Sequence, residues 1–415
     1  MPQIKILIIG NGFGGVYALR NLHKLFHNDK KGRKIEITLV GEKNYFLFTP
    51  LLPEVATGGI NPGNIIEPIR MVLGCCVDKF YLGKAEILNL KNHTVKVENN
   101  LIPYDYLIIA PGAETNFYNI PGAQEYSFKL KSVEDAVKIK NHCITQIERA
   151  MQTEDKAERK KMLKFVVVGG GATGVEMAGE LKELVKESFS RYYPKDVIDD
   201  ISIILIQRGP ELVPQFGPKI SGKSLEVLRA KGVLVMLDSA VKEVSSSYII
   251  LEGDIKIFTE MVIWVAGIKP TKLDFDATVI ESPDGRLIVN EYLQLESYRE
   301  VFAIGDIAFF KQQNIALPAL AQVAEKQSRA VAKNIQLLIA DGKPEKFFYK
   351  SSGKLLSLGR WMAIGEIFNI TFSGYFTWLL WRIVYLSKLI SWRKKARVLL
   401  NWVMNAFSPK DISQI

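Results

Sequence analysis

Cysteine and histidine are scarce in this chain, which has three cysteines and four histidines among its 415 residues. No two cysteines have the CxxC spacing of a redox centre or a metal site, so we expect neither a disulfide framework nor a bound metal. The low cysteine content is typical of a reducing compartment and predicts a protein that faces the cytosol. The adjacent Cys75 and Cys76 are interpreted as buried apolar filler rather than as a thiol switch.

The chain also lacks an uninterrupted apolar run of the length that crosses a membrane, which is about 20 residues. The most apolar stretch, residues 372–407, has Arg382 or Lys388 in every candidate window. Four tryptophans are interleaved with its basic residues, namely Trp378, Trp381, Trp392 and Trp402. Aromatic bulk beside basic residues predicts an amphipathic helical segment that lies in the lipid interface.

Positive charge is concentrated at the same end of the chain. From Thr371 onward there are seven Lys or Arg residues against one acid, Asp411, so this end carries +6 of the formal net charge of +10. Anionic headgroups attract such a segment, which predicts docking on an anionic membrane surface. The alternative is that this C-terminal segment forms a core helix or a dimer contact. The same aromatic and basic residues could also form a homodimer interface.

Two glycine clusters dominate the rest of the sequence. Gly10, Gly12 and Gly15 follow the β-branched run IKILII, and Gly169, Gly171 and Gly174 follow KFVVV. In each cluster the first glycine permits a tight turn, the second lets the backbone approach a pyrophosphate, and the third lets helix and strand pack closely. The clusters begin 159 residues apart, which is more than one βαβ unit of about thirty residues spans. The sequence therefore predicts two dinucleotide-binding domains.

The segments between the clusters suggest how these domains are ordered. Residues 83–113 alternate in hydropathy around Asn-rich turns, which predicts a small antiparallel meander returning to a buried strand at 106–110. A helix is expected from Ser132 to about Met151. We predict an α/β protein with two Rossmann-like domains and a C-terminal amphipathic segment. The predicted domains are residues 1–120 with 270–345 for FAD, 121–269 for NAD(P)H, and 346–415 for the membrane.

Neither nucleotide domain has the usual acid at the end of its second strand, where a carboxylate would bind a ribose hydroxyl. In the first domain Glu42 comes one position late, after Gly41. In the second the strand is followed by Gln207 and Arg208. Without a carboxylate, the 2′-phosphate of NADPH is not repelled, and the guanidinium N–H groups of Arg208 can donate hydrogen bonds to it. This predicts use of NADPH beside NADH. The alternative is that Gln207 binds the ribose and Arg208 is solvated.

Six segments in order carry a resemblance to a known family: GNGFGG, YFLFTPLLPEVATGG, VVVGGGATGVEMAGEL, WVAGIKP, VFAIGD and ALAQVAEKQ. With them the sequence resembles the type II NADH dehydrogenases, single-subunit NADH:quinone oxidoreductases that do not pump protons. The resemblance spans Ile4 to about Phe407. It implies hydride transfer from NADH to FAD and reduction of a membrane quinone, ubiquinone or menaquinone, in a respiratory chain.

The resemblance also implies site residues in the first domain. Glycines of the first turn would hold the FAD pyrophosphate, Glu42 would lie near the adenosine, Thr49 and Pro50 would line the isoalloxazine, and Asp306 would bind the ribityl chain. The full set expected to contact FAD is Gly10, Gly12, Phe13, Gly14, Gly15, Glu42, Lys43, Thr49, Pro50, Ala85, Ala110, Pro111, Gly112, Gly305, Asp306, Ala321 and Gln322.

In the second domain the resemblance places Glu176 beside the nicotinamide, the alternative being a solvent-facing helix acid. The set expected to contact the nicotinamide nucleotide is Gly169, Gly171, Ala172, Thr173, Gly174, Glu176, Gln207, Arg208, Ala266 and Gly267.

The quinone segment departs from the family pattern. Gln322 matches a family glutamine and is expected to neighbour a quinone carbonyl. The slot for a second glutamine holds Lys326, and Gln327 is one position further, about 100° around the helix. Which of Lys326 and Gln327 lines the pocket stays open.

Two other functions are weighed against this interpretation. Disulfide reductases and sulfide:quinone oxidoreductases of this fold need flavin-side cysteines, and none occurs after Cys143. A membrane-associated flavoprotein that senses NADH with little turnover, resembling the apoptosis-inducing factors, is the alternative of another class. We expect a monotopic protein on the cytoplasmic face of a bacterial inner membrane or the equivalent face of an organelle membrane, with no nucleic-acid partner.

Overall fold

The computed structural model describes residues 3–27, 34–72 and 79–414. The chain divides into two compact units, each built from three segments. The first unit comprises Met1–Leu47, Ile66–Glu114 and Ile268–Ser351, and the second comprises Phe48–Ile65, Thr115–Gly267 and Ser352–Ile415. The predicted three-domain boundaries stay a prediction. Cys75 and Cys76 lie outside the described residues.

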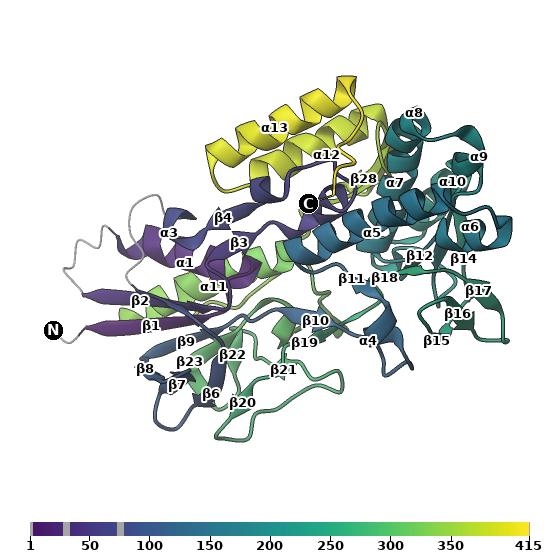
Figure 1. Cartoon of the computed structure of the whole chain (residues 1–415). Coiled ribbons are helices and arrows are strands. Elements are labelled where there is room, and N and C mark those ends of the chain that lie inside the picture. The colour runs from purple at the N-terminus through teal and green to yellow at the C-terminus, as the bar shows by residue number, and fades with distance from the viewer. Residues whose placement is uncertain (1–2, 28–33, 73–78, 415) are drawn as a thin grey trace. The chain divides into compact units, whose positions relative to one another are not determined.

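A six-stranded sheet organises the first unit, in the order β22-β23-β9-β1-β2-β5 (Figure 1). All its pairs are parallel except β22 with β23. The strands are β1 (Ile4–Ile9), β2 (Ile35–Gly41), β5 (Lys79–Leu82), β9 (Tyr106–Ile109), β22 (Gln294–Leu295) and β23 (Tyr298–Ala303). Central strands such as β1 are almost wholly apolar because helices cover parallel sheets. Here α1 (Phe13–Phe26) packs against α11 (Ala321–Ile339).

Smaller elements complete the first unit. The predicted meander is confirmed as the antiparallel strands β6, β7 and β8, which lead into β9, and β20 pairs with β6. Their bounds are β6 (Ala85–Asn89), β7 (Thr94–Val97), β8 (Asn100–Pro103) and β20 (Asp274–Phe275). Short pieces are β3 (Tyr45–Leu47), β4 (Ile66–Pro68), α3 (Ile69–Val72), β10 (Ala113–Thr115), β19 (Ile268–Pro270), β21 (Leu287–Ile288), β24 (Ala308–Phe309), β25 (Lys311–Gln312) and β26 (Ile315–Ala316).

The second unit contains a parallel five-stranded sheet in the order β11-β18-β12-β13-β14. Its strands are β11 (Phe128–Lys129), β12 (Lys164–Val168), β13 (Ser202–Ile206), β14 (Leu234–Met236) and β18 (Met261–Trp264). A three-stranded antiparallel sheet of β15 (Val241–Val244), β16 (Tyr248–Leu251) and β17 (Lys256–Phe258) follows β14. The two sheets, one parallel and one parallel except for β22, confirm the predicted α/β class with two Rossmann-like folds.

One helix of the second unit has the bounds that the sequence predicted. The predicted helix after Ser132 is confirmed as α5 (Val133–Met151), where Ser132 and Asp135 form a reciprocal capping box. The others are α2 (Leu52–Val55), α4 (Ala123–Tyr126), α6 (Lys156–Met162), α7 (Ala172–Leu184), α8 (Ser190–Tyr192), α9 (Lys195–Asp199) and α10 (Pro218–Ala230), with a π-helical turn at Val185–Phe189.

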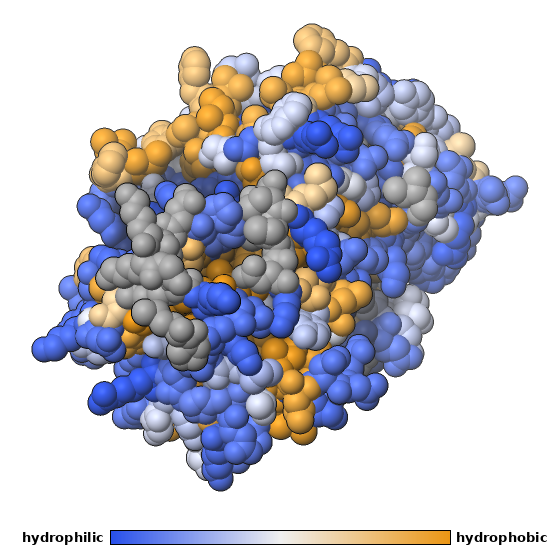
Figure 2. Space-filling view, turned by 90° about the vertical axis from the view of Figure 1, so that its left-hand side faces the viewer, coloured by the Kyte–Doolittle hydropathy of each residue, from blue (hydrophilic) through white to orange (hydrophobic). Residues whose placement is uncertain are grey.

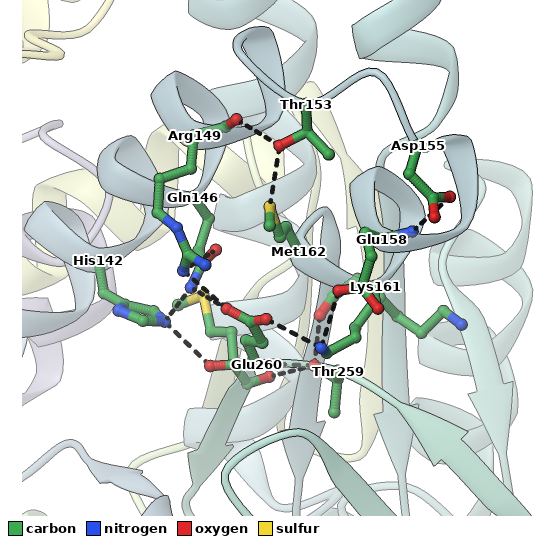
Figure 3. A network of polar contacts seen from close by, with 12 residues as sticks. His142, Gln146, Arg149, Thr153, Asp155, Glu158, Lys161, Met162, Thr259 and Glu260 are labelled. Atoms are coloured by element: carbon green, nitrogen blue, oxygen red, sulfur yellow. Dashed lines mark hydrogen bonds and ion pairs between the residues drawn. The ribbon is translucent and has the colours of Figure 1, made fainter.

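A polar network ties α5 and α6 to the start of β18 (Figure 3). The carboxylate of Glu260 accepts a hydrogen bond from Arg149 at 2.7 Å and pairs with Lys161 at 3.2 Å. His142 Nε2 lies 3.0 Å from the Glu260 carbonyl, and Gln146 bridges the two side chains. Glu260, the residue before β18, therefore connects both α5 and α6 to this strand.

The C-terminal segment begins with an antiparallel sheet before its helices. The strands are β27 (Lys354–Ser357), β28 (Ala363–Ile367) and β29 (Ile370–Gly374), followed by α12 (Tyr375–Lys388) and α13 (Trp392–Phe407), which lie side by side (Figure 1). Among the described residues, no helix is long and apolar enough to span a bilayer.

The tryptophans of this segment differ from the prediction. Trp378, Trp381 and Trp402 are buried inside the second unit, and only Trp392 is exposed, at 73%. Trp378 and Trp402 pack around Arg382, whose guanidinium lies 4.1 Å and 4.3 Å from their ring centres. Trp381 stacks on Tyr385, with ring centres 4.2 Å apart. Other apolar side chains form the exposed face.

That face lies along the top of Figure 2, where apolar side chains gather over α12 and α13. We call it the apolar face; its exposed members are Phe376, Ile383, Trp392, Leu399, Leu400, Val403, Met404 and Phe407. An exposed apolar set of this size on neighbouring helices marks an interaction surface.

Candidate active site

The first glycine turn is shaped by close backbone contacts. Gly10 has φ +96°, and a Cβ there would lie 2.1 Å from the Ala110 carbonyl oxygen. A Cβ on Gly15 would lie 1.8 Å from the Gly10 oxygen, whereas one on Gly12 would meet nothing within 4 Å. Gly10 and Gly15 are thus required by packing, and Gly12 leaves open space in front of the turn.

This open space faces the start of α1. The N-cap Gly12 has no side-chain cap, and the first turn from Phe13 contains no acid. Unpaired N–H groups and the helix dipole at such an end favour an anion. A diphosphate fits this turn, as the sequence predicts for FAD.

Other residues expected to contact FAD follow the strands of the first unit or begin them. Glu42 and Lys43 are exposed after β2, and Ala85 is buried at the start of β6. Ala110 and Pro111 lead from β9 to Gly112, which has φ +83° and open space where a Cβ would be. Gly14 packs closely, since a Cβ there would lie 3.1 Å from that of Ala110.

Asn11 is a residue of this turn that sequence reasoning missed. Its side-chain amide donates to the carbonyls of Lys43 and Tyr45, each at 2.7 Å. It therefore fixes the loop after β2 against the glycine turn. A polar residue between the first two glycines was the available signal.

The predicted quinone segment forms the start of α11. Gln327 is 1% exposed, and its Oε1 accepts a hydrogen bond of 2.7 Å from the backbone N–H of Gly305, next to Asp306. Lys326 donates to the Lys350 carbonyl. Gln322 is half-buried in the first turn, directly after Ala321. Both Lys326 and Gln327 thus have protein partners, and which of them lines a quinone pocket stays open.

The second glycine turn repeats the geometry of the first. Gly169 has φ +116°, and a Cβ there would lie 2.7 Å from the Ala266 Cα. A Cβ on Gly174 would lie 1.8 Å from the Gly169 oxygen, whereas Gly171 faces open space. The helix α7 begins at Ala172 with Thr173 exposed and no acid in its first turn. This turn also fits a diphosphate.

Gln207 supports this second turn. Its Oε1 accepts a hydrogen bond of 2.9 Å from the N–H of Gly170, and its Nε2 donates to the Glu211 carbonyl at 3.1 Å. Both polar atoms of Gln207 therefore have protein partners. Arg208 is exposed, with its guanidinium 6.0 Å from the Tyr118 ring centre.

Glu176 is buried on α7, with 8% of its surface exposed. Its Oε1 accepts a hydrogen bond of 3.2 Å from the N–H of Ser357 in β27. Burial raises the pKa of Glu176 to about 8, the Ser357 N–H opposes this, and the charges of Glu180 and Glu54 add to it. The alternative of a solvent-facing acid is wrong, because the C-terminal strands cover this face of α7.

Further predicted residues lie in the second unit. Thr49 and Pro50 form the start of a 3₁₀ turn, Thr49–Leu51, ahead of α2. Gly267 follows Ala266 with φ +71°, and the Tyr118 hydroxyl lies 2.0 Å from where its Cβ would be. Tyr118 therefore covers the backbone at the end of β18, a contact between distant positions that the sequence did not predict.

Sequence reasoning also missed a group of buried charges beside Glu176. Glu54 on α2 and Glu180 on α7 are 6% and 7% exposed. Lys410 pairs with Glu180, and Arg382 lies between two tryptophans nearby. The spacing of Glu180 four residues after Glu176 was a signal for this group, since such residues share a helix face.

Two family models match the chain. Residues 4–328 match the family described as pyridine nucleotide-disulphide oxidoreductase, and residues 352–411 match the NDH2 C-terminal domain. Together they cover both the dinucleotide folds and the segment with α12 and α13.

Curated relatives are similar over nearly the whole chain. A probable NADH dehydrogenase of Dictyostelium discoideum is 31% identical, covering 99% of this chain and 91% of that protein. The type II NADH:quinone oxidoreductase Ndh of Mycobacterium tuberculosis is 30% identical, covering 98% and 89%.

Among solved structures, NDH2 from Plasmodium falciparum in complex with NADH has a TM-score of 0.88 at 24% identity and covers 99% of both chains. The sulfide:quinone oxidoreductase of Aquifex aeolicus has a TM-score of 0.75 at 20% identity, covering 97% of this chain and 95% of that one. These two likenesses concern the fold.

Proposed function

The chain belongs to the type II NADH:quinone oxidoreductases, and on that premise we propose how its residues serve the reaction. The protein oxidises NADH and reduces a quinone, with FAD as its flavin cofactor. The comparisons give no support to a non-catalytic NADH sensor of the apoptosis-inducing-factor kind. The observation that carries the function is the pair of uncapped glycine turns, each with open space at its middle glycine.

In the first unit, the turn at Gly12 and Gly15 would hold the FAD diphosphate at the α1 N-terminus. Asp306 would bind the ribityl chain from a turn that Gln327 holds through Gly305. When bound, FAD supplies the redox chemistry by accepting a hydride and passing electrons to the quinone. The protein contributes position and electrostatics.

In the second unit, the turn at Gly171 and Gly174 would hold the NADH diphosphate at the α7 N-terminus, with Ala266 and Gly267 near the nicotinamide. Glu176 would orient the nicotinamide from one turn further along α7. Its burial and raised pKa support a role at the site, because perturbed acids cluster at functional positions.

Gln322 would donate a hydrogen bond to a quinone oxygen as negative charge develops there. Its place in the first turn of α11, half-buried, supports this role. Steady-state NADH oxidation with ubiquinone and menaquinone analogues tests it. Gln322→Ala should lower kcat/KM for quinone about tenfold or more while flavin reduction by NADH persists. Equal loss with water-soluble acceptors would contradict a quinone-specific role.

The apolar face would dock on the membrane surface. Its support is the set of large apolar side chains exposed on α12 and α13, together with the exposed Arg393 and Arg397. Basic residues beside an apolar stripe favour anionic headgroups. A homodimer contact at the same face is the second use we propose, and the cytoplasmic side of the membrane is the expected side.

A paired substitution separates these uses. Leu400→Gln with Met404→Gln should abolish binding to anionic liposomes and leave NADH oxidation by soluble quinones largely intact. The control Leu101→Gln changes a 70% exposed leucine in the first unit and should bind liposomes normally. Retained liposome binding together with loss of dimers in light scattering would make the face a dimer contact instead.

NADPH would be accepted beside NADH. No carboxylate occupies position 207 or 208, and the exposed guanidinium of Arg208 can pair with a 2′-phosphate. A preference for NADH above about a hundredfold in kcat/KM, or roughly 2.7 kcal/mol, would refute dual use. Arg208→Gln should raise the preference for NADH.

A further inference from the structure

The guanidinium of Arg382 on α12 has no part in the proposed reaction. Among the described residues, its Nε and Nη1 atoms are buried and have no hydrogen-bond partner. The ring centres of Trp378 and Trp402 lie 4.1 Å and 4.3 Å from its Cζ atom. Leaving charged donors buried and unpaired is costly, so these two nitrogen atoms favour the binding of an acceptor.

The acids whose charges act on Arg382 already have other partners. Glu180 pairs with Lys410, and Glu54 accepts a hydrogen bond of 2.7 Å from Trp402 Nε1. Burial raises the pKa of Glu54, which favours its neutral form. Burial lowers the pKa of Arg382, and the charges of Glu54 and Glu180 only partly oppose this. These carboxylates therefore leave the charge of Arg382 incompletely compensated.

Arg382 and these two acids line a pocket of the second unit. Glu183 and Glu187 complete the acids of the lining, and each forms an ion pair, the latter with Arg360 at 2.8 Å. Trp361 also belongs to the lining and is 40% exposed, so the pocket is open to solvent there. An anionic group that enters beside Trp361 can therefore reach Arg382.

Trp361 has a backbone conformation that bulky residues rarely adopt, with φ +64°. Strain of this kind clusters at ligand-binding positions, where the surrounding structure holds it. The ring centre of Trp361 lies 4.5 Å from that of Trp378 and 5.4 Å from that of Tyr375. The guanidinium of Arg360 lies 4.8 Å from it. These contacts hold the ring between the pocket and the start of α12.

The apolar face adjoins this opening at both helices. Arg360 donates a hydrogen bond of 2.6 Å to the carbonyl of Ala406, which precedes Phe407 on α13. Tyr375, whose ring packs at the same opening, precedes Phe376 on α12. Phe376 and Phe407 belong to the apolar face and are 83% and 87% exposed. Apolar surface therefore borders a pocket that contains an unpaired guanidinium.

We propose that this pocket binds the phosphate of an anionic phospholipid, with Arg382 donating hydrogen bonds to the phosphate oxygens and the acyl chains lying on the apolar face. The inference rests on the proposed docking of that face on a membrane, where phospholipid headgroups are the abundant anions. Arginine is well suited to recognise a phosphate. Phosphatidylglycerol matches the incompletely compensated cation, because its phosphodiester carries one negative charge and its glycerol is uncharged.

A short-chain lipid tests the pocket without a membrane. Dihexanoyl phosphatidylglycerol, kept below its critical micelle concentration, should bind the delipidated holoenzyme in isothermal titration calorimetry. Arg382→Met keeps an apolar stem between the two tryptophan rings and should weaken this binding about tenfold or more. Arg382→Lys keeps the charge and should retain part of the affinity. The control Arg393→Met makes the same change at an exposed arginine outside the lining and should bind like the wild type.

Thermal unfolding of the same variants tests whether Arg382 serves the fold alone. Arg382→Met removes a charge with buried, unpaired nitrogen atoms, so without lipid its melting temperature should equal or exceed that of the wild type. Short-chain phosphatidylglycerol should raise the melting temperature of the wild type and of Arg393→Met. It should not raise that of Arg382→Met. A lipid affinity that is equal in the wild type and Arg382→Met would overturn the proposal.

Two further ligands test the chemistry of the site. Dihexanoyl phosphatidylcholine, whose headgroup has no net charge, and inorganic phosphate should each bind at least about tenfold more weakly than the phosphatidylglycerol. Equal affinity for the phosphatidylcholine would contradict recognition of net charge. Binding of inorganic phosphate as tight as that of the lipid would assign the pocket to free phosphate and overturn the proposal.

Liposome binding separates the pocket from the docking on which it rests. Arg382→Met should still dock on phosphatidylglycerol-containing liposomes, because the apolar face is intact. Leu400→Gln with Met404→Gln should lose that docking and still bind the short-chain lipid, because neither residue lines the pocket. Normal docking of this double variant would refute the proposed docking face, whereas loss of short-chain binding in Arg382→Met would still support the pocket.

Discussion

The two glycine turns of this protein have the same backbone design, but the helices that follow them differ in chemistry. Counting from the first glycine of each turn, Tyr17 on α1 corresponds to Glu176 on α7, and Asn21 corresponds to Glu180. Tyr17, Glu176 and Glu180 are buried, and Asn21 is half-buried. The turn thus determines where a diphosphate fits, and the residues one and two turns later determine what else the helix contributes.

The surroundings of each helix explain the difference. On α1, burial first and then the charge of Glu325 raise the pKa of Tyr17 to about 12, so the phenol stays neutral. Asn21 donates to Ser328 on α11 at 3.3 Å. On α7 the matching positions hold two acids, of which Glu180 pairs with Lys410. These two positions are uncharged on α1, whereas on α7 burial raises the pKa of Glu176 to about 8. Burial also raises the pKa of Glu180, but nearby cations hold it below its ordinary value.

The largest effect is expected from the third glycine of each turn. Gly15→Ala and Gly174→Ala each place a Cβ 1.8 Å from a backbone oxygen and should cost at least about 3 kcal/mol. Gly15→Ala should abolish FAD retention, whereas Gly174→Ala should keep FAD and lose NADH binding, as flavin absorbance and nucleotide titration would show.

Matched controls use the middle glycines. A Cβ on Gly12 or Gly171 meets nothing in the protein, so alanine there should cost about 1 kcal/mol or less. Gly12→Ala should weaken FAD binding, and Gly171→Ala should weaken NADH binding. A loss of stability as large as in Gly15→Ala would show that the middle glycine serves packing.

The next effect concerns Glu176 and pH. Its folded-state pKa is raised to about 8, so the stability it contributes is present below its unfolded pKa and is lost as pH rises through about 8. Each unit by which the folded-state pKa exceeds the unfolded-state pKa corresponds to roughly 1.4 kcal/mol of stability. Denaturant titrations of the wild type should therefore show stability falling over this range, and Glu176→Gln should remove that fall. Parallel curves for the two proteins would contradict a buried neutral acid.

A smaller effect is expected from the side chains that support the two glycine turns, Gln207 at the second and Asn11 at the first. Gln207→Leu leaves the buried N–H of Gly170 unpaired and should cost about 2 kcal/mol. Asn11→Leu frees carbonyls, of which that of the exposed Lys43 can bind water, and should cost about 1 kcal/mol. Thermal unfolding measures both. Gln207→Glu keeps an acceptor for Gly170 and should be close to wild type; a cost equal to that of the leucine would contradict this role.

The smallest effect tests the scaffold of the second unit away from α7. Glu260→Gln weakens partly exposed ion pairs with Arg149 and Lys161 and should cost about 1 kcal/mol. Although burial raises the pKa of Glu260, those two cations hold it below its ordinary value. The difference from wild type should be present at neutral pH and vanish as pH falls through that lowered pKa. The Glu176 titration should stay unchanged.

Much of the fold could be predicted from local patterns. The strands β1 and β12, the meander before β9 and the helix α5 follow from β-branched runs, alternation and a capping residue. The C-terminal segment was only partly predicted. Its composition indicated amphipathic helices, but the burial of three tryptophans depends on contacts with Arg382 and with other aromatic rings and could not be inferred from composition.

The candidate site shows the same division. The two dinucleotide turns could be located from adjacent residues alone, because a GxGxxG turn depends on backbone sterics among neighbours. Only the tertiary structure brought Glu54, Glu180 and Lys410 together, from positions up to 356 residues apart (410 − 54). Local sterics act over a few bonds and are written in adjacent residues, whereas burial and electrostatic pairing depend on which distant segments the folded chain places in contact.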